Sequence, residues 1–317
     1  MKILITGGAG FIGSNLSRAL HENKYFQVEE IIVIDNLSLG KKEFIQDLID
    51  NKRFFFYEED LLNFDVVLKI FEKHKIDLVW HLSANSDIGY GAKFTDWDLK
   101  QGTLVTYNVL ECMKRTNTKK IIFASTSAIY GEATILPTPE NYGPLHPISF
   151  YGASKLACEG LITAFSHNFN FQAWMYRFGN IVGKNGTHGV IFDFIKKLKN
   201  NSEELEVLGN GKQAKPYLYV EDCIDGMAYG FKNSTEQTNF FNLACEGATK
   251  VSTIAKSVIE IAEPTAKIKY TGGERGWVGD VAQVRLETKK MEAINWKATH
   301  TSDEAVKLAI DDLIKQI

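Results

Sequence analysis

A tyrosine and a lysine stand four residues apart in the segment 150–155 (FYGASK). In a helix this spacing places two side chains on one face, one turn apart, so Tyr151 and Lys155 are predicted neighbours. Lowering the pKa of a phenol from about 10 to near 7 takes on the order of 4 kcal/mol. An ammonium about 4 Å away supplies roughly that much at an effective dielectric constant of about 20. The pair can therefore make a base, although taken alone it can equally be a chance pair on a solvated helix face.

A glycine-rich turn follows the first apolar stretch of the chain. Residues 2–6 (KILIT) predict a buried strand, and residues 7–13 (GGAGFIG) lead into a helix with apolar residues at spacing four. Glycines allow a tight turn, close approach to a pyrophosphate and packing of helix on strand, while the helix amino end faces the phosphate charge. The predicted dinucleotide contacts here are Gly7, Gly10, Phe11, Ile12 and Gly13.

An acidic residue ends the second predicted strand. Residues 30–34 (EIIVI) predict that strand, and Asp35 follows about 20 residues after the last glycine of the turn. A carboxylate in this place accepts hydrogen bonds from a ribose diol and repels a 2′-phosphate. The sequence therefore predicts NAD rather than NADP as the cofactor.

Strand-like and helix-like segments alternate through the first half of the chain. Predicted strands cover residues 53–57, 77–81 and 120–125, and predicted helices cover residues 66–74 and 97–115. Such alternation predicts an α/β fold with a Rossmann-type, doubly wound parallel sheet that binds ligands at the carboxyl ends of its strands. At those ends we expect Asp60 and Leu61 near the adenine, and the small residues Ser83 and Ala84 beside the cofactor.

Hydroxyl side chains gather at the end of the fifth predicted strand, in Ser125, Thr126 and Ser127. Hydroxyls at a strand end are often turn formers. Here one proline-rich loop separates them from Tyr151, and the expected geometry is three groups around one substrate oxygen. Ser127 would hydrogen-bond the reacting hydroxyl, Tyr151 would move its proton, and Lys155 would hold the phenolate and the nicotinamide ribose.

Composition excludes several classes of protein. The 317 residues are 44% hydrophobic and 24% charged, which suits one large domain with a smaller lobe. The net charge of -3 and the lack of a Lys/Arg cluster argue against nucleic acid or a membrane surface as partner. Four scattered cysteines indicate free thiols in a reducing compartment, and no metal site is predicted. Without a signal peptide or a long apolar run, the protein is expected to be cytoplasmic.

Over essentially its whole length, the chain resembles the extended short-chain dehydrogenase/reductases of the NAD-dependent nucleotide-sugar epimerase/dehydratase family, most of all the members like UDP-glucose 4-epimerase. The matching segments are residues 6–13, 35–40, 81–84, 125–127, 151–155 and 177–180. The resemblance implies further cofactor contacts at Asn36, Ser38, Gly40, Leu82, Gln101, Ser125 and Phe178.

Regular alternation stops after a predicted strand at 173–177, which predicts an NAD-binding domain at 1–177 with the Tyr/Lys helix and a smaller α/β lobe at 178–317. The resemblance implies that this lobe binds the nucleotide sugar. Asn180 and Arg275 would reach the diphosphate, and Tyr217 would pack near the nucleotide. The implied substrate contacts are Ser127, Asn180, Val190, Lys215, Tyr217, Arg275, Asp280 and Val284. Lys215 stands where relatives usually carry arginine, and an ammonium lacks the bidentate fork. A looser phosphate contact or a different nucleotide is therefore expected.

The expected reaction depends on an absence. Dehydratases of this group place an Asp-Glu pair directly after the hydroxyl residue, because eliminating water needs a base and an acid, and the decarboxylases keep the glutamate. Here Ser127 and Ala128 occupy these positions. The resemblance thus implies epimerisation, with oxidation at C4 by hydride transfer to NAD and return of the hydride to the other face of the 4-keto sugar. A nucleotide-sugar dehydrogenase, 4-ketoreductase or 4,6-dehydratase is the enzyme alternative. A non-enzymatic dinucleotide sensor is disfavoured because the Tyr/Lys pair is retained.

Two further expectations come from the resemblance. Relatives form homodimers by packing the helix predicted at 97–115 against the one that starts near Tyr151. Val284 stands where glucose-restricted relatives carry a bulky tyrosine over the sugar C2 substituent, so an N-acetylhexosamine nucleotide is expected to fit. The alternative is that Val284 is a strand residue in a displaced alignment. The base and the sugar are otherwise left open.

Overall fold

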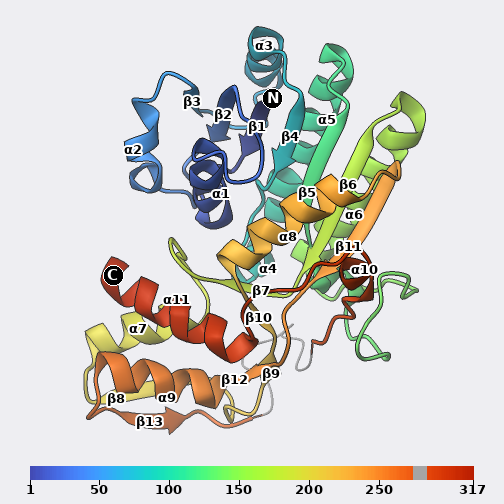
Figure 1. Cartoon of the computed structure of the whole chain (residues 1–317). Helices are drawn as coiled ribbons and strands as arrows, with labels where there is room; N and C mark the ends of the chain where they lie inside the picture. Colours follow the sequence, from blue (N-terminus) through green and yellow to red (C-terminus); the bar gives the residue numbers. More distant parts are fainter. Residues whose placement is uncertain (274–283) are drawn as a thin grey trace. The chain divides into compact units, whose positions relative to one another are not determined.

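The computed structural model describes residues 1–273 and 284–317, which form two compact units (Figure 1). The first unit comprises residues 1–131, 143–177 and 227–241, and the second comprises residues 132–142, 178–226 and 242–317. The expected division between residues 177 and 178 is thus also a division between the units. The chain nevertheless changes unit several times rather than once.

A seven-stranded sheet is the frame of the first unit, with strand order β11-β6-β5-β4-β1-β2-β3. The pairs β1/β2, β1/β4, β2/β3 and β4/β5 are parallel. Strand order runs outward from β1 in both directions, so the predicted doubly wound Rossmann-type sheet is confirmed. The strands are β1 (Lys2–Thr6), β2 (Glu30–Asp35), β3 (Phe54–Glu58), β4 (Leu78–His81), β5 (Lys120–Thr126), β6 (Gln172–Phe178) and β11 (Thr238–Leu243).

Helices cover both faces of this sheet (Figure 1). On one face, Phe71 of α3, Val109 of α5 and Ile162 of α6 share a hydrophobic core with Leu4 and Phe123 of the strands. On the other face lie α1 and the C-terminal half of α8. The helices of this part of the chain are α1 (Phe11–His21), α3 (Phe64–His74), α5 (Val105–Thr116), α6 (Phe150–Phe169) and α8 (Val220–Asn233), with the short segments η1 (Lys42–Phe44), α2 (Gln46–Ile49), α4 (Ile88–Lys93) and η3 (Ser127–Tyr130).

The helix predicted at 97–115 begins differently from the expectation. A π-helical segment, η2 (Leu99–Leu104), precedes α5. A Cβ atom on Gly102 of this segment would lie 2.2 Å from the Ser154 hydroxyl oxygen, so glycine leaves room for the Ser154 side chain of α6. The Thr106 hydroxyl donates to the Gly102 carbonyl at 2.7 Å. Apolar spacing predicts the helix, but a local change of helix type does not alter that spacing.

The second unit has its own core, in which α7, α9 and α11 pack together with residues of small parallel and antiparallel strand pairs. Its strands are β7 (Asn180–Val182), β8 (Glu204–Val207), β9 (Ala214–Lys215), β10 (Tyr217–Tyr219), β12 (Thr249–Lys250) and β13 (Lys267–Tyr270). Its helices are α7 (Val190–Asn200), α9 (Val251–Ala262), α10 (Lys289–Ala293) and α11 (Ser302–Gln316).

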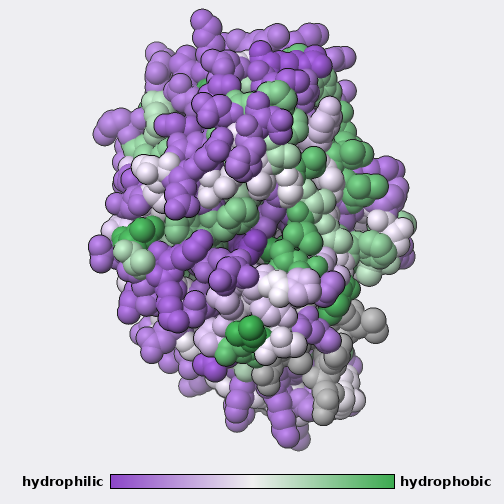
Figure 2. All heavy atoms as spheres, turned by 90° about the vertical axis from the view of Figure 1, so that its right-hand side faces the viewer, coloured by the Kyte–Doolittle hydropathy of each residue, from purple (hydrophilic) through white to green (hydrophobic). Residues whose placement is uncertain are grey.

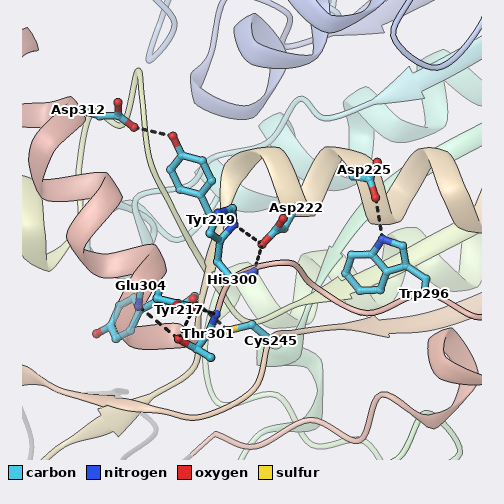
Figure 3. Close-up of polar contacts among 10 residues, drawn as sticks. All are labelled: Tyr217, Tyr219, Asp222, Asp225, Cys245, Trp296, His300, Thr301, Glu304 and Asp312. Carbon is cyan, nitrogen blue, oxygen red and sulfur yellow. Dashed lines mark hydrogen bonds and ion pairs between the residues drawn. The ribbon is translucent and has the colours of Figure 1, made fainter.

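Polar contacts fix α11 within the second unit (Figure 3). The Tyr219 hydroxyl donates to Asp312 of α11 at 2.9 Å. Asp222 Oδ2 accepts from both the backbone N–H and Nδ1 of His300, each at 3.0 Å. Thr301 then begins α11 with a capping box, which satisfies N–H groups at the helix start. The start of α8 and the last helix are therefore joined through side chains.

Two observations bear on the compartment and the membrane. The four cysteines are free thiols. Across residues 1–273 and 284–317, no helix combines the length and the apolar character that crossing a bilayer requires.

Candidate active site

Tyr151 and Lys155 lie in the first two turns of α6. Ser149 caps this helix by accepting a hydrogen bond from the Gly152 N–H at 3.0 Å. Lys155 is buried, and its ammonium donates to the Ala124 carbonyl at 2.6 Å. The same nitrogen lies 5.9 Å from the centre of the Tyr151 ring. The predicted proximity of the two side chains is confirmed, and Ala124 ties the pair to the end of β5.

The hydroxyl group that binds the Tyr151 phenol belongs to Thr126, the last residue of β5. Thr126 also accepts from the Ala128 N–H at 3.1 Å and so caps η3. Ser127, the hydroxyl predicted for this role, stands one residue later and is half-buried. Successive residues of a strand point to opposite sides, so a shift of one residue selects a different hydroxyl. Thr126 therefore replaces Ser127 as the hydroxyl beside the phenol.

Burial dominates the titration of the pair. It raises the pKa of Tyr151 to about 12, although the hydrogen bond from Thr126 acts in the opposite direction. Burial also lowers the pKa of the Lys155 ammonium to about 8, while nearby negative groups such as Asp98 oppose this. The effect of the Lys155 ammonium on the phenol therefore stays a prediction, because burial opposes it in this structure. The ammonium charge is partly engaged by Ala124, and a buried phenolate is costly.

The glycine turn is built for close approach of the backbone. Gly7 has a φ of +70°, and a Cβ atom on it would lie 3.0 Å from the Ser83 backbone. A Cβ atom on Gly13 would lie 2.1 Å from the Gly7 carbonyl oxygen. Helix α1 starts after Gly10, which has no side chain to cap it, so N–H groups of the first turn can serve an anion. This arrangement fits the pyrophosphate of a dinucleotide.

Asp35 lies against this turn at the end of β2. One carboxylate oxygen accepts from the Ala9 N–H and the other from the Leu37 N–H, both at 2.9 Å. The pKa of Asp35 is raised by burial, which these hydrogen bonds oppose. A Cβ atom on Gly40 would lie 2.8 Å from the carboxylate, so glycine leaves space beside it. The position fits a ribose next to the pyrophosphate, as the sequence predicts.

Other predicted cofactor residues meet around Asp60. The amide groups of Asn36 and Gln101 donate to the same Asp60 oxygen, at 3.0 Å and 3.3 Å. The Ser38 N–H donates to the Asn36 side chain at 3.1 Å, which shapes the loop after β2. Leu61 is buried next to Asp60. Three segments far apart in the sequence are thus brought to one place.

Beside the glycine turn, the segment after β4 carries Leu82, Ser83 and Ala84. The Leu82 N–H donates to the Thr6 carbonyl at 3.2 Å, and the Ser83 N–H donates to the Thr6 hydroxyl at 3.3 Å. These bonds hold the segment next to the end of β1, where the predicted cofactor site lies.

Two of the predicted cofactor contacts have buried side chains. Ser125 is buried, and its hydroxyl donates to Glu159 of α6 at 2.6 Å, so its side chain serves the helix rather than a ligand. Phe178 is 6% exposed at the end of β6. Neither side chain offers an open surface to a dinucleotide in this structure.

Three predicted substrate residues lie on short strands of the second unit. Tyr217 pairs with Asn180 where β10 runs parallel to β7, whereas Lys215 lies on β9, which pairs with β12. Asn180 is exposed and Lys215 is half-buried. Tyr217 is 3% exposed and belongs to the hydrophobic core of this unit. The expected packing of its ring on a nucleotide is therefore not supported, because the ring is already enclosed.

The remaining substrate predictions lie at the margins of what is described. Val190 begins α7 and packs at the edge of the same core. Val284 is half-buried, next to Arg285, whose carbonyl accepts from the Thr138 N–H at 2.8 Å. The predicted contacts Arg275 and Asp280 lie outside the described residues.

A histidine that was not predicted joins the glycine turn to α5. His81 is fully buried, with Nδ1 2.6 Å from the Thr6 hydroxyl and Nε2 2.9 Å from the Thr106 hydroxyl. Burial lowers its pKa to about 3, so the ring is neutral. Thr106 already donates to the Gly102 carbonyl, so it accepts from Nε2–H, and Nδ1 accepts from Thr6. The sequence feature that could have indicated this role is the position of His81 at the end of a predicted strand.

Comparison with known proteins places these features in context. The model of the NAD dependent epimerase/dehydratase family matches residues 3–244. A putative UDP-glucose 4-epimerase of Methanocaldococcus jannaschii is 32% identical over 323 aligned residues, which cover 98% of this chain and 97% of that protein. Among solved structures, a UDP-galactose 4-epimerase is 34% identical with a TM-score of 0.87, and both chains are fully covered. The UDP-glucose 4-epimerase of Thermotoga maritima with UDP-glucose is 30% identical with a TM-score of 0.89, over 100% of this chain and 99% of that one.

Proposed function

The chain belongs to the NAD-dependent epimerase/dehydratase family, and from this premise we propose that it is a 4-epimerase of UDP-sugars. NAD is the cofactor, as in the family. The main support for the proposal is the sequence that follows Thr126, whose hydroxyl contacts the Tyr151 phenol. Thr126 is followed by Ser127 and Ala128, so the chain has no carboxyl group there to assist elimination. Without elimination, the reaction that remains is oxidation and re-reduction of the sugar at C4.

The residues of α6 and β5 divide the proton chemistry between them. NAD, when bound, accepts a hydride from the sugar and returns it. Tyr151 takes the proton of the sugar C4 hydroxyl and gives it back after reduction. Its high pKa means that the phenolate must be favoured by its neighbours, and the chain offers the Thr126 hydroxyl and the Lys155 ammonium. The Ala124 carbonyl holds that ammonium in place.

The proposed substrate is a UDP-sugar because the relatives named above are described as acting on UDP-sugars. Lys215 of β9 and Asn180 of β7 supply polar groups in the second unit. The Lys215 ammonium cannot form the paired hydrogen bonds that an arginine guanidinium forms, so its contact with the diphosphate is expected to be weaker. Asp35 supports the preference for NAD over NADP by charge repulsion of a 2′-phosphate.

A panel of UDP-, dTDP- and GDP-sugars tests the proposed function. Each is incubated with the purified protein and followed by proton NMR and by absorbance at the NADH band. We expect the C4 epimer of a UDP-sugar, NAD retained on the protein, and no accumulation of NADH. A 4-keto-6-deoxy product would identify a dehydratase instead, and stoichiometric NADH would identify a dehydrogenase. Conversion of none of the UDP-sugars would overturn the proposal.

A homodimer is also proposed, with α5 and α6 at its interface. Leu104 at the end of η2, Tyr107 of α5 and Phe169 of α6 are 43%, 45% and 36% exposed. The Tyr107 ring lies 6.3 Å from Phe165, which in turn lies 5.3 Å from Phe169, so aromatic side chains link the two helices. Figure 2 shows apolar side chains gathered on the side of the molecule where α6 lies. Exposed apolar surface of this kind supports association.

A further inference from the structure

Three consecutive residues at the end of β5 bind three residues of α6 that are spaced one turn apart. The contacts join Ala124 to Lys155 at 2.6 Å, Ser125 to Glu159 at 2.6 Å, and Thr126 to Tyr151. Two of the three α6 residues are the proposed proton-transfer pair. The third, Glu159, continues the same helical row one turn beyond Lys155.

Glu159 is in turn held by an arginine from the neighbouring strand. Arg177 of β6 binds its carboxylate with two nitrogens, Nε at 3.0 Å and Nη2 at 2.8 Å. The remaining guanidinium nitrogen Nη1 donates to the Tyr130 hydroxyl of η3 at 2.9 Å. Glu159 and Arg177 are only 4% and 5% exposed. Through these contacts the ion pair joins the ends of β5, β6 and η3 to α6.

Stability alone is a poor explanation for this ion pair. A buried ion pair loses hydration, and well-packed apolar residues of similar volume often stabilise a fold equally well. Apolar residues at positions 159 and 177, however, would not accept the Ser125 hydroxyl or place a negative charge one turn from Lys155. These two properties act on the site rather than on the fold.

We propose that Glu159 is a positioning residue of the reaction, which, together with Arg177, fixes the end of β5 so that Thr126 stays on Tyr151 and Ala124 stays on Lys155. This inference rests on the proposed function for its kinetic consequences. Its structural and electrostatic consequences are measurable without any substrate.

The charge of Glu159 also acts on the Lys155 ammonium. The titratable groups around this ammonium are Tyr151, Cys158 and Glu159 on α6, Asp98 before η2, and the neutral His81 on β4. The negative charge of Glu159 raises the pKa of Lys155. Removing it leaves the Arg177 charge without its partner, which disfavours the ammonium further. Both effects lower the pKa of Lys155.

Two variants separate the two roles of Glu159. Glu159→Gln keeps the shape of the side chain but removes its charge. Ser125→Ala removes the bond from β5 and leaves the ion pair with Arg177 intact. Asp47→Asn is the matched control, because Asp47 forms a two-point ion pair with Arg18 on the exposed surface of the same unit. Thermal unfolding and NAD content are measured for each variant, and kinetics are expressed per NAD-bound protein.

The expected results differ between the variants. In Glu159→Gln, the titration midpoint of Lys155, followed by ¹³C NMR of labelled lysine and assigned with Lys155→Met, should fall by about one pH unit. In Ser125→Ala this midpoint should stay in place, while kcat falls roughly tenfold with little change in KM, because one hydrogen bond of positioning is lost. Asp47→Asn should match the wild type in both measurements.

Two outcomes would overturn the inference. One is a Lys155 titration that is the same in Glu159→Gln and in the wild type. The other is a wild-type kcat per NAD-bound protein in both variants, which would show that the ion pair serves the fold alone. If the wild type converts none of the sugar nucleotides, the proposed function fails, and the NMR titration still decides the role of Glu159. If Glu159→Gln does not fold, the double variant Glu159→Gln/Arg177→Met, which leaves no unpaired charge, takes its place.

Discussion

Burial raises the pKa of the Tyr151 phenol to about 12, so its neighbours must make it a base. Among those neighbours, the hydroxyl of Thr126 is in contact with it, whereas Ser127 follows in η3. The two residues carry the same functional group, and only the direction of the side chain distinguishes them. Apolar spacing does not reveal which way each side chain points at the end of a strand. The sequence therefore does not distinguish Thr126 from Ser127.

Substitutions at these positions give a direct test. Tyr151→Phe should retain the fold and bound NAD but lose turnover by about 10²–10⁴-fold, since proton transfer is removed. Thr126→Ala should lower kcat by roughly tenfold to a hundredfold through loss of a hydrogen bond to a charged phenolate. Ser127→Ala is the matched control and should have a much smaller effect. Steady-state kinetics on the three variants measure these losses. A larger loss of kcat in Ser127→Ala than in Thr126→Ala would show that Ser127 is the hydroxyl that acts with Tyr151.

A second prediction at the residue scale concerns Val284, which is half-buried in the second unit. If Val284 lines the pocket for the sugar C2 substituent, an acetamido group fits beside it, whereas a tyrosine would overlap with that group at a cost of about 1–3 kcal/mol. Val284→Tyr should therefore depress kcat/KM for UDP-GlcNAc by roughly tenfold to a hundredfold and leave UDP-Glc nearly unchanged. Equal effects on both sugars would remove Val284 from the pocket.

At the scale of elements, His81 joins β1, β4 and α5, and its burial makes stability depend on pH. Its pKa is lowered from 6.5 to about 3 on folding. Between these values the unfolded chain binds more protons than the folded one. The stability that the neutral ring contributes is thus fully present above about pH 6.5 and is lost as the pH falls towards 3, by up to about 1.4 kcal/mol per unit.

Denaturant unfolding of wild type and His81→Gln at pH 7.5, 6.5 and 5.5 measures this dependence. The variant should be less stable at pH 7.5 and show a smaller loss between pH 6.5 and 5.5, because glutamine does not titrate. His167, an exposed histidine of α6, provides the control variant His167→Gln, which should follow the wild type. Parallel curves for wild type and His81→Gln would show that His81 does not cause the acid sensitivity.

The turn between β1 and α1 allows a further test with two helical glycines. A Cβ atom on Gly13 would lie 2.1 Å from the Gly7 carbonyl, whereas a Cβ atom on Gly160 of α6 meets nothing within 4 Å. Gly13→Ala should therefore lower the unfolding temperature and abolish NAD retention. Gly160→Ala should raise stability by about 0.5–1 kcal/mol and keep the cofactor. Retention of NAD by Gly13→Ala would contradict the close approach at this turn.

Much of this architecture is predictable from the sequence, and the exceptions have local causes. The strands from β1 to β6 and the glycine turn follow from apolar runs and from Gly7, Gly10 and Gly13. The π-helical segment η2 is not predicted, because apolar spacing does not distinguish it from the α-helix that follows. Ser125 was assigned to the cofactor, since nothing in its neighbourhood along the chain reveals Glu159 as its partner.

At the scale of the whole molecule, the exposed apolar residues of α5, α6 and the preceding η2 make assembly testable. Leu104→Glu places a charge in the proposed interface and should convert a dimer into a monomer in sedimentation at micromolar concentration. Ile261→Glu is the control, because Ile261 of α9 is similarly exposed, at 45% against 43% for Leu104, but lies in the other unit. A wild type that sediments as a monomer would remove the dimer proposal.

The repeated change of unit along the chain limits how such a protein can be recombined. Residues 227–241 belong to the first unit although they follow the expected boundary. The ring centroids of Phe231 and Trp174 are 4.6 Å apart, and the Tyr176 hydroxyl donates to the Met227 carbonyl at 2.8 Å. Residues 1–177 made alone would leave β6 without its neighbour β11, and with it an unpaired sheet edge. If two diverged relatives were recombined at residue 177, β6 would come from one protein and its neighbour β11 from the other. The two strands would then not have evolved together. Single substitutions within the second unit are therefore expected to be tolerated more readily than exchange of the whole unit between relatives.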